Sequence, residues 1–193
     1  MRSERRRALG DHDSGAVAVE TALVATLLLI LIFGIVESSF LFKDWLTVSA
    51  AARAGARMGS SEPRATGLTL PRAFADDSAA QVTNAMSGLD PANLQEVWVY
   101  QAAYATGLPV SGASCTANCV KYNWPTGATK LTYLSGSWPA TSQNACAGDP
   151  NRDAIGVYVK YKHTSPLGFF FKNFMVSESA VMWIEPTSAA VCK

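Results

Sequence analysis

An apolar run near the N-terminus constrains the fold more than any other feature of this chain. Sixteen residues, 21–36, carry no charge, and residues 16–19 extend the apolar stretch to twenty-one residues if Glu20 is tolerated within it. At about 1.5 Å per residue, such a helix is about 32 Å long and crosses a hydrocarbon core of about 30 Å. The run therefore predicts a single transmembrane helix.

The charges on either side of this segment predict its orientation. A cluster of four arginines precedes it, whereas the first basic residue after it is Lys43. An excess of positive charge marks the cytoplasmic side, so we expect a cytoplasmic N-terminus and an exported C-terminal domain in a single-pass protein of the plasma membrane. A removable secretory signal is disfavoured, because the nearest small-residue pattern, Val48-Ser49-Ala50, ends fourteen residues beyond Val36.

The cysteines agree with this orientation. All four lie in the C-terminal part of the chain, which the membrane topology places in an oxidising compartment. They are Cys115, Cys119, Cys146 and Cys192. Four cysteines allow three pairings; strand-like neighbours favour Cys119–Cys146, with Cys115–Cys192 as the second bridge. A Cys115–Cys119 bridge within a turn is the alternative.

A short motif overlaps the start of the apolar run. Gly15 is followed after four residues by Glu20, a basic leader precedes them, and the membrane-length run follows. This arrangement resembles the sites cut by prepilin peptidases. The resemblance implies cleavage between Gly15 and Ala16, so that residues 1–15 are a cytoplasmic leader that is removed.

The following stretch, LLLILIFGIVESSFLFKDWLTVSAAARAGARMGS, resembles the TadE-like pseudopilins of the Tad/Flp pilus system. Its similarity to them lies in Gly34 and Glu37 of FGIVE, in an aromatic patch and in the alanine-rich segment SAAARAGAR. The patch consists of Phe40, Phe42 and Trp45. The resemblance covers residues 14–58. Major Flp pilins are short and commonly carry an aromatic residue where this chain has Thr21, so a minor pilin or pseudopilin is indicated.

The resemblance also implies a role for Glu20. In pilin assemblies this carboxylate pairs with the N-terminal amine of a neighbouring subunit; the alternative is that it reaches the cytoplasmic headgroups by itself. Small residues and a second acid are candidates for helix packing during assembly. They are Gly34, Glu37, Ala51 and Gly55. Beyond the bilayer, packing of the small residues against the chain's own domain is an equal alternative.

The remaining sequence predicts an exported α+β domain. No proline interrupts residues 16–58, which we expect to form the transmembrane helix and its extracytoplasmic extension, and residues 59–193 form the domain. A second helix is expected within residues 70–87. Alternating β-branched and aromatic residues predict an antiparallel sheet of four or five strands packed on the long helix. The candidate strands are residues 94–100, 119–124, 130–135, 155–163 and 176–185.

Several function classes find little support. The net charge is +1 and no basic stripe is present, which argues against nucleic-acid binding. The histidines are His12 in the leader and His163 at a strand end, and no hydrolase or nucleotide-binding motif occurs. We therefore predict no enzymatic activity, no cofactor and no metal site.

Two further motifs have plain interpretations. Residues 149–153 show the D-x-N-x-D spacing of a calcium loop, but Ala154 replaces its glycine and Lys160 its final acid, so a polar turn is favoured. The aromatic segment GFFFKNF, residues 168–174, is expected to lie in the core or at a subunit interface rather than against lipid.

Together these features predict a minor pilin or pseudopilin that takes part in assembly of a Tad/Flp-type pilus. Its partners would be a prepilin peptidase, other Tad/Flp pilins, the inner-membrane assembly platform and the lipid bilayer. The alternative is a single-pass membrane protein that is never processed and that carries an extracytoplasmic binding or enzymatic domain.

Overall fold

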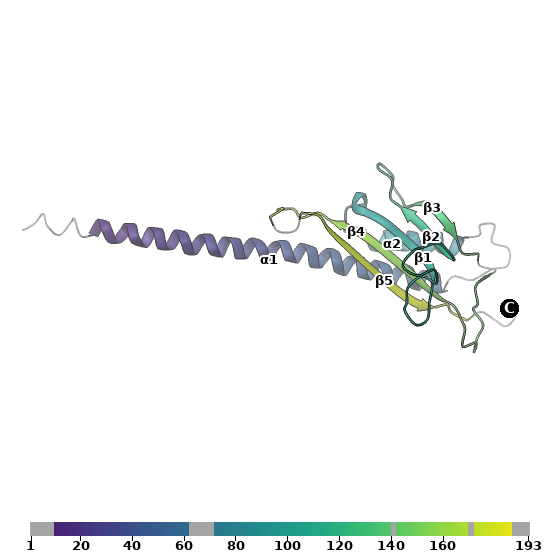
Figure 1. The fold of residues 1–193 in the computed structure, drawn as a ribbon. Helices are drawn as coiled ribbons and strands as arrows, with labels where there is room; N and C mark the ends of the chain where they lie inside the picture. The colour runs from purple at the N-terminus through teal and green to yellow at the C-terminus, as the bar shows by residue number, and fades with distance from the viewer. Residues whose placement is uncertain (1–9, 62–71, 140–141, 170–171, 187–193) are drawn as a thin grey trace, which may run out of the picture.

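The apolar run forms the first part of one continuous helix, α1 (Gly10–Ser61), of 52 residues. Figure 1 shows the computed structural model, in which the N-terminal half of α1 projects from the domain and its C-terminal half packs on it. The structure describes residues 10–61, 72–139, 142–169 and 172–186, with side chains in α1 from Gly15 onward. At about 1.5 Å per residue α1 is about 78 Å long, so only part of it crosses a bilayer.

Five antiparallel strands form a single open sheet in the order β3-β2-β1-β4-β5. They are β1 (Leu94–Ala102), β2 (Cys119–Asn123), β3 (Thr132–Ser137), β4 (Ala154–His163) and β5 (Phe174–Trp183). The first three form a meander, and the β4–β5 hairpin joins the sheet on the other side of β1. The predicted α+β fold with an antiparallel sheet is confirmed.

Two helices cover one face of this sheet (Figure 1). They are the C-terminal half of α1 and α2 (Ala73–Ala85), with a short 3-10 helix (Pro91–Asn93) leading into β1. Alternation along the strands directs valines toward the helices. Val97, Val99, Val157 and Val159 are fully buried there together with Val48, Ala52 and Val82 of the helices. This layer is the hydrophobic core, and it fixes α1 to the sheet.

The opposite face of the sheet carries a smaller cluster beneath the loop that joins β1 to β2. Tyr100, Cys119 and Ala154 belong to it. The Tyr100 ring lies on Gly156 of the neighbouring strand, where a Cβ atom would come within 2.3 Å of the ring. Glycine is therefore required at position 156. The Tyr100 hydroxyl donates to the carbonyl of Gly107 at 3.0 Å, which holds the loop over the sheet.

Candidate membrane anchor and assembly surface

The N-terminal part of α1 presents its side chains outward on all sides. Residues 15–33 are exposed, and this region is long and apolar enough to cross a membrane. The two threonine hydroxyls within it are satisfied inside the helix: Thr21 and Thr26 each donate at 2.8 Å to a carbonyl one turn earlier, on Val17 and Ala22. No hydroxyl of this pair needs water, which suits a lipid environment.

The motif residues Gly15, Ala16 and Glu20 lie on this projecting segment. All three are exposed, and apart from its chain neighbours and the helix backbone no atom of the described residues lies within 4 Å of the place that a Cβ on Gly15 would occupy. The Glu20 carboxylate is therefore accessible to a second molecule. Residues 1–9 of the predicted leader lie outside the described part of the chain.

Glu37 behaves differently from Glu20. Its side chain is 0% exposed, because the loop between β4 and β5 folds over it and the Ser165 hydroxyl donates to its carboxylate. The amide of Gly168 donates to the same Ser165 oxygen at 3.1 Å. Glu37 therefore belongs to an internal junction between α1 and this loop, at the point where the helix meets the domain.

The β4–β5 loop reaches one helical turn further toward the N-terminus. Phe169 stacks on Phe33 of α1, with ring centroids 5.7 Å apart and planes inclined by 16°. Gly34, beside this contact, is half-buried. Phe169 itself remains 68% exposed, so of the two predicted places, core or subunit interface, the core is wrong at this position, and the interface stays a prediction. Residues 170 and 171 of that segment lie outside the described residues.

Further along α1, two polar contacts tie the helix to the hairpin. The Asp44 carboxylate lies 2.7 Å from Nδ1 of His163, whose side chain is 1% exposed. Trp45 donates from its indole to the Glu178 carboxylate of β5 at 2.5 Å. His163 ends β4 as predicted and is buried against α1. None of these partners could be found from the sequence, because no local pattern relates residues so far apart in the chain.

The small residues on the C-terminal half of α1 pack inside the same chain. Ala51 is 0% exposed, and a Cβ on Gly55 would lie 2.6 Å from Cγ2 of Val82. A Cβ on Gly59 would lie only 2.3 Å from Cδ1 of Ile155 on β4. Of the two alternatives for these residues, packing against the chain's own domain is the one observed.

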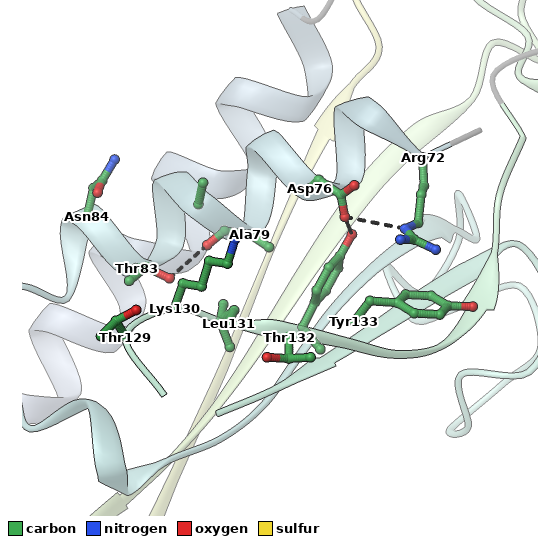
Figure 2. Close-up of a pocket in the computed structure, with 12 residues that line it drawn as sticks. Arg72, Asp76, Ala79, Thr83, Asn84, Thr129, Lys130, Leu131, Thr132 and Tyr133 are labelled. Atoms are coloured by element: carbon green, nitrogen blue, oxygen red, sulfur yellow. Dashed lines mark hydrogen bonds and ion pairs between the residues drawn. The ribbon is translucent and has the colours of Figure 1, made fainter. Parts of the chain in front are cut away.

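A cleft of about 540 Å³ lies between α2 and the edge strand β3 (Figure 2). Asp76 accepts a hydrogen bond of 2.7 Å from Tyr122. Arg72 lies 3.5 Å from the same carboxylate, an ion-pair distance without hydrogen-bond geometry, and its guanidinium lies 3.7 Å from the centre of the Tyr133 ring. Burial, and next the hydrogen bond to Asp76, raise the pKa of Tyr122. The acid is thus already paired, and these groups form a structural network.

The calcium-like segment is also used internally. Asp149 accepts hydrogen bonds from the Asn151 amide at 2.8 Å and from the Asn144 side chain at 2.7 Å, and the latter bond is the main cause of its lowered pKa. Asp153 accepts from the Asn144 amide and from Gln101. The interpretation as a turn held by short polar side chains is confirmed.

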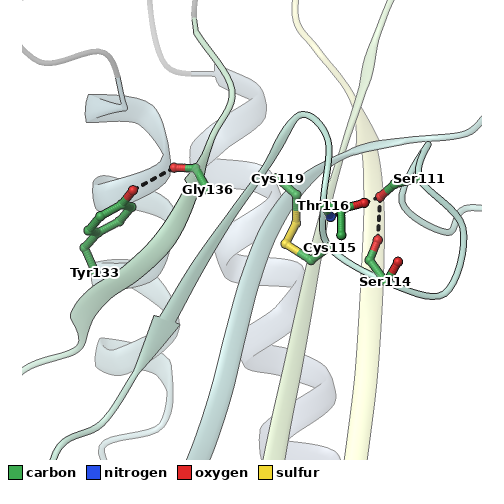
Figure 3. The surroundings of a disulfide bond; sticks show 7 residues. All are labelled: Ser111, Ser114, Cys115, Thr116, Cys119, Tyr133 and Gly136. Carbon is green, nitrogen blue, oxygen red and sulfur yellow. Dashed lines mark hydrogen bonds between the residues drawn. A yellow bond between two sulfur atoms is a disulfide. The ribbon is translucent and has the colours of Figure 1, made fainter.

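One disulfide joins Cys115 to Cys119, with Cα atoms 5.4 Å apart (Figure 3). The favoured Cys119–Cys146 pairing is therefore wrong, and with it the Cys115–Cys192 bridge. The turn between the two cysteines, with Asn118 at φ 47°, brings them together at the start of β2. Cys146 is also disulfide-bonded, and Cys192 lies outside the described residues.

The comparisons with known proteins bear on the projecting helix. Residues 15–57 match the model of the TadE-like protein family. The resemblance predicted from the sequence is confirmed over this segment, which includes Gly15, Glu20 and most of α1, both its projecting part and much of the part packed on the sheet. No curated protein and no solved structure matches the chain significantly.

Proposed function

We propose that this chain, TadE-like over residues 15–57, is a minor pilin or pseudopilin that takes part in assembling a Tad/Flp-type pilus. Its role is structural rather than catalytic. The observation that carries the proposal is the family match on a helix whose first half stands free of the domain and is exposed on all sides. A helix with such a surface needs lipid or other helices around it.

Processing by a prepilin peptidase is the first step of this proposal. The peptidase cuts between Gly15 and Ala16 at the cytoplasmic end of α1, and the rest of the helix stays in the membrane. The exposure of Gly15, with no packed side chain within 4 Å of the place that its Cβ would occupy, supports access of a peptidase to this bond. The exported domain then lies outside the cytoplasm, as the arginine-rich leader and the disulfides suggest.

Glu20 has the second role. Cleavage creates a positive amine on Ala16, about one helical turn from Glu20. A carboxylate at membrane depth costs a few kcal/mol unless it is paired. Pairing with the amine of a neighbouring subunit neutralises the two charges together, and it favours one axial register between the subunits. The other pilins and the assembly platform in the inner membrane are the partners of this surface.

N-terminal sequencing tests the processing step. The full chain is expressed with a prepilin peptidase of a Tad system, and the mature protein is expected to start at Ala16. Gly15→Leu should keep Met1, whereas the control Gly10→Leu, outside the motif, should be processed like the natural chain. An intact Met1 on the natural chain in the presence of the active peptidase would favour the unprocessed single-pass alternative.

A further inference from the structure

The β4–β5 loop touches the membrane anchor itself. Phe169 stacks on Phe33, which lies four residues before Glu37 within the uncharged part of α1. Four residues correspond to about 6 Å along the helix. Phe169 thus lies beside a residue of the apolar span although it belongs to the domain. Figure 1 shows the β4–β5 hairpin extending along α1.

The described part of this loop is suited to the boundary between hydrocarbon and headgroups. Its outward side chains include Leu167, 39% exposed, and Phe169, 68% exposed. Two of its polar groups are turned inward: Ser165 donates to Glu37, and Gly168 donates to Ser165. Thr164 and Asn173, nearer the strands, are exposed. Lys172, three positions after Phe169 in the chain, is exposed, and a lysine close to a membrane surface can extend its ammonium to lipid phosphates. Irregular backbone is excluded from deep hydrocarbon, so the loop belongs at the membrane surface.

We infer that Leu167 and Phe169, here called the tip of the β4–β5 hairpin, insert at the outer surface of the lipid bilayer and set how deeply α1 is immersed. Lipid is favoured over a protein partner because the apolar surface of the tip continues directly into the exposed surface of residues 15–33. This inference rests on the proposed membrane anchor.

The tip position also fixes the depth of Glu20. If the hydrocarbon ends near Phe33, a span of about twenty residues begins near Ser14. Glu20 then lies about 9 Å inside the inner boundary, since it is six positions after Ser14 at about 1.5 Å each. The folded domain would thus hold this carboxylate below the surface, where it needs a partner.

Nitroxide labels test the inference in the full chain. Phe169→Cys is labelled with its native disulfides intact and reconstituted into vesicles of phosphatidylcholine and phosphatidylglycerol. Relaxation by oxygen, which concentrates in lipid, is compared with relaxation by a water-soluble nickel chelate. Ile30→Cys within the span and Tyr104→Cys, an 84% exposed aromatic position at the opposite end of the sheet, are the references. Leu167→Cys provides a second probe of the tip.

We expect the ratio of oxygen relaxation to nickel relaxation to be several-fold higher at positions 169 and 167 than at position 104. The ratio at these two positions should still be lower than the ratio at position 30. A water-like ratio at 169 and 167 with a lipid-like ratio at 30 would overturn the inference and leave the anchor intact. Low relaxation by both reagents at 169 would show that protein covers the tip, which also overturns it. A water-like ratio at position 30 would overturn the anchor, and the inference with it.

Discussion

The Asp44 carboxylate of α1 and the His163 imidazole of β4 meet at 2.7 Å, although 119 positions separate them in the chain. Together with the Trp45–Glu178 hydrogen bond, this contact joins the helix to the β4–β5 hairpin. The hairpin is thereby aligned along α1, and its tip reaches Phe33. The domain and the projecting anchor therefore form one unit rather than two parts on a linker.

Removing the acid of this pair should destabilise the domain. Asp44→Ala leaves a nearly fully buried histidine without its partner, and an unsatisfied buried polar group costs about 1–3 kcal/mol. We expect the free energy of unfolding to fall by that amount, measured by urea titration with near-ultraviolet circular dichroism in detergent micelles. Arg53→Ala, on the exposed face of the same helix, is the control and should change it by less than about 0.5 kcal/mol. Equal losses would contradict the assigned role of the pair.

The side of α1 that packs on the domain through small residues should not accept a larger side chain. Gly55→Leu places a side chain where even a Cβ would lie 2.6 Å from Val82, and we expect a loss of about 3 kcal/mol from overpacking. Ala50→Leu adds a comparable side chain to an exposed position of the helix and should be neutral. The comparison uses thermal unfolding of the isolated chain. If both variants melt like the natural protein, residue 55 is not packed inside the domain.

Much of this fold follows from local sequence patterns. Each of the five predicted strands and both predicted helices is present, because alternation and apolar periodicity act over a few residues. The ends were less predictable, since pairing decides them. β5 begins at Phe174 instead of residue 176, because Phe174 pairs with His163. β3 extends to Ser137 because Gly136, at φ 90°, fits against Cys119 and pairs with Val120.

The candidate site was predictable only where its signal is local. The spacing of Gly15 and Glu20 and the apolar run identify the anchor, and the family match covers both. The burial of Glu37 could not be predicted, because Ser165 is 128 positions away and only the hairpin register brings it there. The disulfide pairing failed for a similar reason: strand-like neighbours do not distinguish a long-range bridge from one across a turn.

The disulfides can be assigned by a non-reducing tryptic map. Cys115 and Cys119 lie together on peptide 73–121, and we expect an internal bridge there. Cys146 is disulfide-bonded and lies on peptide 131–152. The one cysteine left in the sequence is Cys192, so we expect a linkage to peptide 173–193. A linked pair of peptides 73–121 and 131–152 would contradict the observed bridge.

Replacing the short bridge should weaken the domain moderately. The loop that it closes is small, and the chain-entropy relation gives about 2 kcal/mol for such a loop. Cys115→Ser with Cys119→Ser should therefore lower the free energy of unfolding by about that amount while the sheet is retained. Far-ultraviolet circular dichroism checks the sheet, and urea titration checks the stability. The natural chain after reduction is not a suitable control, because reduction also opens the bridge of Cys146.

The buried tyrosines predict a loss of stability in alkali. Burial raises the pKa of Tyr122 above its ordinary value of 10.0, and it raises those of Tyr100 and Tyr161. Above about pH 10 the unfolded chain therefore releases phenolic protons that the folded chain retains, and the free energy of unfolding falls as pH rises. The stabilising contribution of these tyrosines is present in full at pH values below the pKa that they have in the unfolded chain.

Tyr122→Phe isolates one part of that effect. Loss of the hydrogen bond to Asp76 should cost about 1 kcal/mol near neutral pH, and the difference from the natural chain should shrink above about pH 10. Urea titrations over this range measure both curves. Parallel curves for the two proteins would show that Tyr122 does not retain its proton in the folded state.

Glu20 provides the most direct test of assembly. The side chain is exposed on a helix that matches the TadE-like family, and an unpaired carboxylate in the membrane is unfavourable. Glu20→Ala should therefore insert as well as the natural chain. It should nevertheless co-purify with partner pilins at least tenfold less, equivalent to about 1.4 kcal/mol of lost pairing. Thr21→Ala, the neighbouring exposed position, is the control and should assemble normally, because its hydroxyl bonds only within the helix. Undiminished co-purification of Glu20→Ala, after processing at Gly15 has been verified, would show that this carboxylate does not hold the subunits together.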